Sequence, residues 1–361
     1  MTFTPDTARA WVDVDLGALV ANARAIAARC GNRLLPMVKA NGYGLGAIEV
    51  ARALESLEPW GYGVATVEEG AALRASGITR PILVASPLLP EAIDGYLDND
   101  LRPAVGDPAA LGAWCGRSDR PFHLEIDSGM GRAGVRWDEP SAVAAVAARL
   151  HEAAGWEGAF THFHSADTDP ASVETQWARF QEVLAALPRR PRLVHAANSS
   201  AALRGSRFAA DLVRPGIFLF GGGAGGTEPR PVAALRARVL AVRRLGAGAS
   251  VSYGATWRAA VPTTIATIGV GYGDGFLRAA RHPGPPRLVE LDGSLLPVVG
   301  RVTMDMTMLD AGDAEVRPGD VATLYGGRVS LDRQAEASGT ISYELLTALA
   351  TRLPRRYRSE P

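Results

Sequence analysis

The chain has 361 residues, of which 47% are hydrophobic and 21% are charged, as in folded globular proteins. Its 38 basic residues balance its 38 acidic residues, which argues against nucleic acid or an anionic membrane as the main partner. The length favours two domains. We expect no membrane span, no secretory signal and no metal site, and the two cysteines fit a cytoplasmic location.

The first elements can be placed from their patterning. Residues 10–14 alternate as a short strand does, and this strand is either part of the first domain or packed with the second. Asp15 is expected to cap a helix that runs to Cys30, because apolar residues recur there at helical spacing. A short apolar run then ends at Lys39, next to a Gly-X-Gly turn.

From there to about residue 214, short apolar runs alternate with amphipathic helical patterns. The runs are expected to end near residues 38, 65, 85, 105, 126, 160, 196 and 213. Strands that alternate with helices pair in parallel, and about eight repeats in roughly 200 residues predict a closed (β/α)₈ barrel. The alternative is an open doubly wound sheet, although no Gly-X-Gly-X-X-Gly follows the first strand.

The pattern changes after a glycine-rich segment at residues 221–229, which we interpret as a flexible link. Apolar runs then follow one another without long helices, and Asp292-Gly293 between two of them predicts a hairpin. A helix over about 343–352 is expected near the end of the chain. We therefore predict an α/β barrel domain over residues 10–225 and a mainly β domain over residues 226–361.

Lys39 is the only lysine among the 38 basic residues. A lysine amine can lose its proton, act as a nucleophile and form an imine with an aldehyde, whereas an arginine stays protonated. A single lysine at the end of a predicted buried strand, in a chain that otherwise uses arginine, therefore suggests a chemical role.

Other polar residues follow later strands of the predicted barrel, and catalytic groups gather at the carboxyl ends of barrel strands. We expect Asp127 to support a turn. The turn at Gly216 and Ile217 could supply backbone N–H groups to a phosphate. The candidates that follow a strand are Lys39, Arg132, His162, Asn198, Ser199 and Arg214.

Several motifs resemble the alanine racemase family across nearly the whole chain. VKANGYG at residues 38–44 is similar to the family's pyridoxal phosphate signature, and VSYG at 251–254 is similar to its second catalytic stretch. Further matches are GYGDG at 271–275, GRVTMD at 300–305 and ISYE at 341–344. The resemblance implies a (β/α)₈ barrel with a C-terminal β domain, and racemisation of L- and D-alanine that supplies D-alanine for peptidoglycan.

The resemblance also implies residue roles and a head-to-tail homodimer. Lys39 and Tyr253 would be the two catalytic bases, with Tyr253, Met304 and Asp305 entering the barrel of the partner chain. Substrate would contact Arg132, Tyr272, Met304 and Asp305. The cofactor, pyridoxal 5'-phosphate, would be held by Lys39, Tyr43, Arg132, His162, Asn198, Ser199, Arg214, Gly216, Ile217 and Tyr343.

These roles make chemical sense. Two bases on opposite faces can remove and return a proton at the α-carbon without rotating the intermediate. An arginine such as Arg214 beside the pyridine nitrogen cannot accept a proton, so it would keep the ring unprotonated. That limits charge stabilisation, which suits a reaction that only moves a proton and avoids transamination.

Two positions depart from the family pattern. Many members carry a carbamylated lysine where this chain has Glu125, whose carboxylate would supply similar charge to Arg132. His164 stands where a small residue is expected, and we expect it at the surface. These departures keep open a racemase of serine or of broad specificity. A basic amino-acid decarboxylase is opposed by Arg214, and a non-catalytic cofactor carrier is opposed by the β domain that carries Tyr253.

Overall fold

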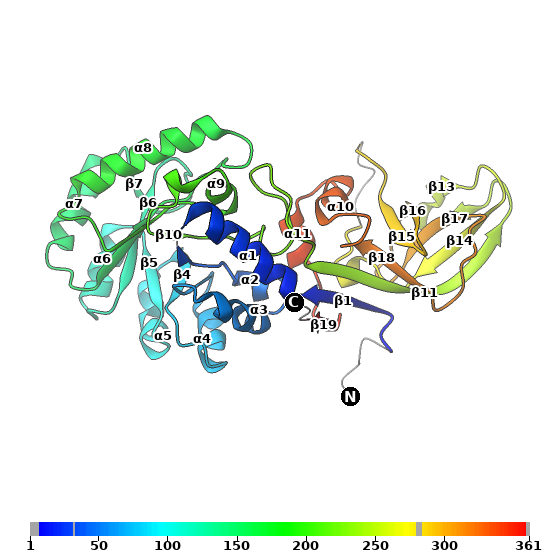
Figure 1. Ribbon diagram of the computed structural model, residues 1–361, viewed down its shortest axis with the longest axis horizontal. Helices are drawn as coiled ribbons and strands as arrows, with labels where there is room; N and C mark the ends of the chain where they lie inside the picture. Colours follow the sequence, from blue (N-terminus) through cyan, green and yellow to red (C-terminus); the bar gives the residue numbers. More distant parts are fainter. Residues whose placement is uncertain (1–6, 32, 279–283, 359–361) are drawn as a thin grey trace.

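The structure, a computed structural model, describes residues 7–31, 33–278 and 284–358. Figure 1 shows two lobes along the long axis, one of strands surrounded by helices and one built mainly of strands. Strand β1 (Ala10–Asp15) lies where the two lobes meet. The two predicted lobes are therefore present, with β1 at their junction.

The first lobe is a closed barrel of eight parallel strands within the described residues, which confirms the predicted (β/α)₈ fold. Around the barrel they run β2-β10-β9-β8-β6-β5-β4-β3, and Met37 bridges to Gly63 to close the ring. The amide of Val38 donates to the carbonyl of Gly63 at 2.8 Å across this closure. The strands are β2 (Arg33–Leu34), β3 (Tyr62–Val64), β4 (Ile82–Pro87), β5 (Arg102–Val105), β6 (Phe122–Asp127), β8 (Trp156–Phe160), β9 (Leu193–His195) and β10 (Leu212–Val213), and β7 (Val135–Arg136) pairs with β6.

Helices cover the outside of the barrel, and their ends follow from capping residues. The Asp15 carboxylate accepts from the Ala18 amide at 2.7 Å, as predicted, and Gly31 ends the first helix with φ +68°. The helices are α1 (Leu16–Cys30), α3 (Ala47–Leu54), α4 (Val67–Ala75), α5 (Ile93–Asp98), α6 (Pro108–Cys115), α7 (Pro140–Leu150), α8 (Pro170–Ala186) and α9 (Ser199–Leu203), with short 3₁₀ turns η1 (Glu55–Leu57), η2 (Pro90–Ala92) and η3 (Ser206–Phe208). None of the helices in the described ranges has the length and apolar character needed to cross a membrane.

The second lobe contains an eight-stranded sheet in the order β14-β17-β16-β15-β18-β11-β1-β19, so the predicted mainly β domain is confirmed. Strand β1 pairs antiparallel with β11 and parallel with β19, which places residues 10–15 in this sheet. The other strands are β11 (Ala233–Leu245), β14 (Thr263–Ile268), β15 (Leu288–Leu291), β16 (Ser294–Val299), β17 (Thr307–Gly312), β18 (Val321–Tyr325) and β19 (Arg355–Arg358), with a separate hairpin of β12 (Ser250–Val251) and β13 (Trp257–Arg258).

The turns of this lobe match the sequence in part. Asp292 and Gly293 join β15 to β16 with φ of +46° and +74°, so the predicted hairpin is confirmed. The expected late helix is present as α11 (Ser342–Thr347) but ends earlier than predicted, and α10 (Leu331–Ala337) precedes it.

The glycine-rich segment between the lobes is folded against the barrel. Ala224 and Thr227 form a β-bridge, and a Cβ at Gly225 would lie 2.9 Å from the carbonyl oxygen of Ser200 in α9. This close approach explains a glycine at that position, where φ is +57°. The domain limit near residue 225 stays a prediction.

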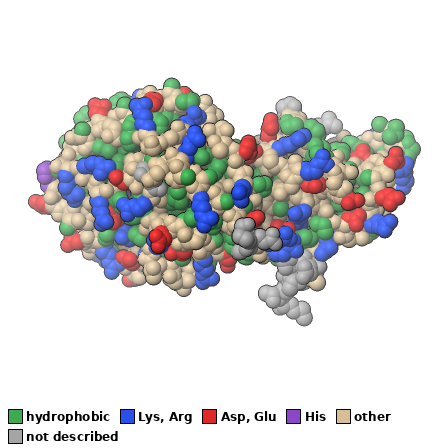
Figure 2. Space-filling model, in the orientation of Figure 1, with side chains coloured by type: hydrophobic (Ala, Val, Ile, Leu, Met, Phe, Trp, Pro, Cys, Tyr) green, Lys and Arg blue, Asp and Glu red, His purple; other side chains and the backbone are tan. Residues whose placement is uncertain are grey.

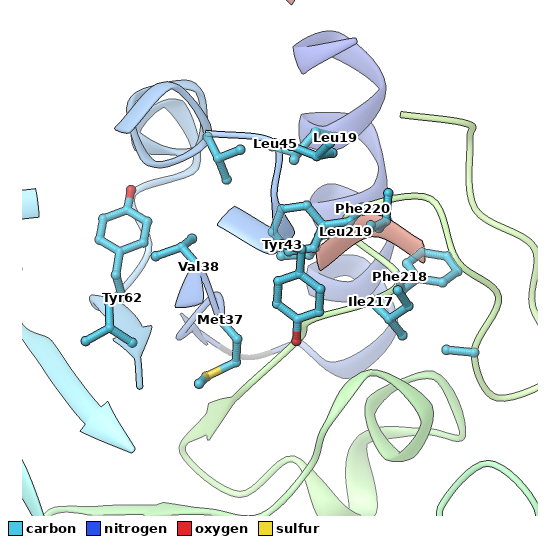
Figure 3. Close-up of a cluster of buried hydrophobic side chains, with 14 of the residues drawn as sticks. Leu19, Met37, Val38, Tyr43, Leu45, Tyr62, Ile217, Phe218, Leu219 and Phe220 are labelled. Carbon is cyan, nitrogen blue, oxygen red and sulfur yellow. The ribbon is translucent and has the colours of Figure 1, made fainter. Parts of the chain in front are cut away.

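Two features of the packing bear on function. Figure 3 shows the apolar side chains that surround the turn after β2, among them Leu19 of α1, Val38, Leu45 and Phe220, which belong to one buried core. This packing anchors the segment that carries Lys39. On the face drawn in Figure 2, basic and acidic side chains are interspersed over both lobes, as expected from the balanced charge.

Candidate active site

A pocket of about 480 Å³ opens at the carboxyl ends of the barrel strands. Among its lining residues are all ten residues that the sequence assigned to the cofactor. They are Lys39, Tyr43, Arg132, His162, Asn198, Ser199, Arg214, Gly216, Ile217 and Tyr343. The residues that follow barrel strands meet in one cavity because parallel strands end on the same side of the barrel, and Tyr343 joins them from the second lobe.

Lys39 begins a left-handed turn, α2 (Lys39–Tyr43), two residues after the Met37–Gly63 bridge that closes the barrel. Ala40, Asn41, Gly42 and Tyr43 have φ between +52° and +62°. A left-handed conformation costs a residue other than glycine about 1–2 kcal/mol, so the surrounding structure must hold this turn.

Glu69 of α4 is one of the groups that hold the turn. Its carboxylate accepts from the amide of Ala40 at 2.6 Å and from the amide of Ala65, after β3, at 2.7 Å. The side chain of Asn41 also accepts from the amide of Ala47 at 3.0 Å. The orientation of Lys39 is therefore set by hydrogen bonds from two neighbouring elements.

The environment of Lys39 favours its neutral form. Burial lowers the pKa of the Lys39 amine, and the positive charges of Arg132 and Arg214 lower it further, while Glu69 acts in the opposite direction. A lysine with a lowered pKa is a better nucleophile and a better acceptor of protons near neutral pH.

Tyr43 and Gly216 form one wall of the pocket. The ring of Tyr43 stacks on Phe220 with 4.4 Å between ring centres, and Figure 3 shows its hydroxyl between Met37 and Ile217. A Cβ at Gly216 would lie 2.3 Å from the Tyr43 hydroxyl oxygen, so only glycine fits there. The Gly216 amide donates to Ser199 Oγ at 2.9 Å. Hydroxyls and backbone N–H groups thus converge here, which suits a phosphate group.

Neighbouring groups complete this wall. The side chain of Asn198, not that of Ser199, caps helix α9 by accepting from the Ala201 amide at 3.0 Å. Tyr343 reaches the pocket from α11 in the second lobe, with its ring centre 6.1 Å from that of Tyr43. Burial raises the pKa of Tyr343 to about 12, so its hydroxyl stays a donor at neutral pH.

Arg214 is a buried residue that also lines the pocket. Its Nη2 donates to the carbonyl of Thr161 at 2.7 Å, and its Nη1 donates to the carbonyl of His195 at 3.0 Å. The guanidinium also lies 5.2 Å from the ring centre of Phe160. Burial lowers the pKa of Arg214 to about 10, so it remains a cation near neutral pH.

His162 lies beside this arginine, with Nδ1 3.3 Å from Arg214 Nη2. Burial lowers the pKa of His162 to about 3, and the charges of Arg214, Arg132 and Lys39 act in the same direction. The imidazole is therefore neutral at pH 7. His164, two residues on, is exposed, as the sequence predicts.

Glu125 brings a carboxyl group to the same pocket. It lies in β6 with only 4% exposure, and among the described residues its Oε2 has no hydrogen-bond partner. Burial raises the pKa of Glu125, whereas the charge of Arg132 lowers it. The turn between them is built on Asp127, which accepts from the amides of Gly129 at 2.9 Å and Gly131 at 3.1 Å and so has the structural role predicted for it.

Replacement of Glu125 by glutamine is expected to lower kcat/KM by about 10- to 100-fold, because Arg132 would lose the negative charge that Glu125 brings to the pocket, and each tenfold change corresponds to about 1.4 kcal/mol. Steady-state kinetics and the absorbance of the bound cofactor check this. The shape of the side chain is kept, so the thermal unfolding midpoint should change little. Unaltered kinetics and absorbance would show that the carboxylate is unnecessary.

The remaining predicted residues lie on the β domain and do not line the pocket of their own chain. Tyr253 is 69% exposed, Met304 53% and Tyr272 42%. Asp305 accepts from Arg352 at 2.8 Å. Because these large side chains face solvent in a single chain, they are free to contact a second copy of the chain.

Sequence reasoning missed several groups that shape the site. Glu69, Phe160, Thr161 and His195 all support the residues named above. The sequence around Glu69 did contain a helix-capping signal, because Thr66 and Glu69 are three residues apart, as in a capping box. In the structure Thr66 Oγ1 accepts from the Glu69 amide. The others are ordinary strand residues in sequence, and only the barrel brings them to Arg214.

Protonation of the histidines should destabilise the fold at mildly acidic pH. Burial lowers the pKa values of His123, His162 and His195 below 6.5. The unfolded chain therefore binds more protons below pH 6.5, and stability is lost as pH falls from there. We expect the free energy of unfolding to drop by up to about 1.4 kcal/mol per histidine per pH unit. Urea unfolding at pH 7 and pH 5.5 measures this, and equal free energies would contradict it.

The pocket of the barrel contains a lysine with a lowered pKa, a buried arginine, and hydroxyl and N–H groups that can bind an anion. These features define a lysine-dependent barrel enzyme. Family models for the alanine racemase N-terminal domain and C-terminal domain match residues 14–224 and 232–357. The chain therefore belongs to the alanine racemase family.

Individual relatives agree over their full lengths. The chain is 38% identical to an alanine racemase of Acidiphilium cryptum, covering 96% of this chain and 98% of the relative. It is also 38% identical to an alanine racemase of Deinococcus radiodurans, covering 96% and 99%. A solved alanine racemase of Bartonella henselae with covalently bound pyridoxal phosphate superposes with a TM-score of 0.89 at 31% identity, covering 97% of this chain and all of that one.

Proposed function

We propose that this enzyme interconverts L- and D-alanine with pyridoxal phosphate, and that Lys39 and Tyr253 are its two bases. One observation carries the proposal: the only lysine of the chain lies in the barrel pocket with a lowered pKa, and a buried cationic arginine, Arg214, lines the same pocket. Family membership supports alanine as the substrate.

The pocket fits the cofactor in its shape and its donors. Gly216 lacks the Cβ that would meet the Tyr43 hydroxyl, so this hydroxyl lies close to the Gly216 backbone, and the phosphate would be held beside them with Ser199 and Tyr343 nearby. Arg214 would donate to the pyridine nitrogen. When bound, pyridoxal phosphate supplies an aldehyde for Lys39 and a conjugated ring that stabilises negative charge at the substrate α-carbon.

The chain's own residues then move the protons. The Lys39 amine would take or return the α-proton on one face, and the Tyr253 hydroxyl would do so on the other. Arg214, always a donor, would keep the ring nitrogen unprotonated and so limit side reactions. Arg132 would hold the substrate carboxylate, supported by the charge of Glu125.

We also propose a head-to-tail homodimer. Tyr253, Tyr272 and Met304 are exposed on the β domain and absent from the pocket of their own chain, so a second copy would place them at its partner's site. There Tyr272, Met304 and Asp305 would shape the substrate entrance. A role in supplying D-alanine for peptidoglycan follows from the activity, and the cytoplasmic location stays a prediction.

The test is a coupled assay with each antipode of alanine and of serine. We expect kcat/KM for alanine to exceed that for serine in both directions. Equal or greater turnover of serine would favour the alternative, a racemase of serine or of broad specificity. Cofactor binding without turnover of any amino acid would overturn the proposal.

A further inference from the structure

A line of buried polar groups leads away from Arg214 through the barrel interior. Arg214 Nη1 lies 2.8 Å from His195 Nδ1, and His195 Nε2 lies 2.8 Å from His123 Nδ1. His123 Nε2 lies 3.3 Å from Glu157 Oε2, which also accepts from Arg102 Nε at 2.8 Å. Both histidines are completely buried, and the line crosses strands β9, β6, β8 and β5.

The chemistry of the two ends fixes the direction of every hydrogen bond in this line. A guanidinium only donates, so His195 Nδ1 must accept and its proton must sit on Nε2. His195 Nε2 then donates to His123 Nδ1, which places the His123 proton on Nε2 as well. That proton points at the Glu157 carboxylate, which only accepts. The line therefore runs from a cation to an anion with one allowed arrangement.

The charges are consistent with this arrangement. Burial and the charge of Arg214 lower the pKa of His195, and burial also lowers that of His123, so both rings are neutral. Burial alone would raise the pKa of Glu157, but the His123 hydrogen bond and the charge of Arg102 hold it at about 2. A proton is held far more tightly at Arg214 than at Glu157, so the line fixes protons in place and does not transport them.

We propose that His195, His123 and Glu157 are positioning residues that set the orientation of Arg214 by locking both imidazoles in the Nε2–H tautomer. The reverse tautomers would set the N–H of His195 against the N–H of Arg214, and the guanidinium would have to turn away. The role of this orientation in catalysis rests on the proposed function, in which Arg214 faces the pyridine nitrogen. The locked tautomers themselves do not depend on that function.

The tautomers can be read directly in the full-length enzyme with its cofactor bound. ¹⁵N-histidine NMR at neutral pH distinguishes Nδ1–H, Nε2–H and doubly protonated rings, and His→Gln variants at positions 123 and 195 assign the two signals. We expect both rings as Nε2–H. A ring with its proton on Nδ1, a mixture of tautomers or an imidazolium at either position would overturn the proposal. The tautomers themselves are read in the wild-type enzyme, and the variants serve only to assign the signals.

Changing the far end of the line tests its influence on the pocket. Glu157→Leu removes the final acceptor, so the His123 ring should become a mixture of tautomers and kcat should fall about tenfold with little change in KM. Glu157→Gln keeps an acceptor oxygen and should restore both the Nε2–H signals and most of kcat. A purely structural role for Glu157 would leave the tautomers unmoved.

Glu174→Leu is the matched control, because Glu174 forms a 2.7 Å pair with Arg207 at the surface, away from the pocket. It should alter neither tautomers nor kinetics. If Glu157→Leu keeps wild-type tautomers and kcat, or behaves like the control, the proposal is wrong. Normal tautomers in a wild-type enzyme that does not racemise alanine would instead contradict only the proposed function.

Discussion

Lys39→Ala is expected to lower racemisation of alanine by about 10⁴-fold or more, because the variant lacks both the amine that binds the cofactor covalently and one of the two bases. Lys39 begins the left-handed turn, but among the described residues its side chain donates no hydrogen bond that holds the turn, so folding should be retained. Steady-state kinetics measure the loss, and borohydride reduction followed by peptide mass spectrometry tests the covalent link.

Borohydride trapping is unusually clean in this chain because it contains no other lysine. The wild type should carry the reduced cofactor at Lys39 and the variant should carry none. Lys39→Arg keeps the positive charge but cannot form the link, so it should be as inactive as the alanine variant. Added small primary amines should partly restore Lys39→Ala. Racemisation at the wild-type rate in either variant would exclude Lys39 as a base.

Tyr253→Phe is expected to lower racemisation by about 10²- to 10⁴-fold, because one face of the substrate loses its proton donor and acceptor. Lys39 remains, so the α-proton of one antipode should still exchange with solvent deuterium, while exchange from the other antipode is lost. Mass spectrometry of each antipode after incubation in heavy water measures this asymmetry. Exchange that stays equal and rapid for both antipodes would rule out this role.

A matched control separates the loss of a catalytic hydroxyl from a general effect of the substitution. Tyr96 of α5 is buried in the barrel domain away from the pocket, so Tyr96→Phe removes a phenolic hydroxyl without touching the site. Its kinetics should match those of the wild type. A similar loss in both variants would mean that the Tyr253 effect is indirect.

Much of the barrel was predictable because its signals are local. Each strand is a short apolar run, and each run ends close to a polar or glycine-rich turn, so the expected strand ends near residues 65, 105 and 213 agree with the structure to within one residue. The position of a polar residue after a strand then predicts that it faces the pocket, which is why Arg132, His162 and Arg214 could be grouped from sequence.

The groups that support these residues could not be predicted, since their roles arise from contacts across the barrel. His123 and His195 are 72 positions apart, and neither has a neighbour in sequence that signals a buried hydrogen bond. The left-handed turn after Lys39 contains Ala40 and Tyr43, which do not favour positive φ, so it depends on tertiary contacts such as those of Glu69 and Phe220. Strand β19 was missed because its arginines resemble a charged tail.

The central claim, that each site takes Lys39 from one chain and Tyr253 from its partner, is tested most directly by mixing two inactive variants. Lys39→Ala and Tyr253→Phe subunits are unfolded together, refolded and assayed for alanine racemisation. In a mixed dimer one site would contain both intact residues, so random pairing should restore about a quarter of wild-type activity. Activity that stays at the level of the separate variants, in dimers shown to be mixed, would contradict the claim.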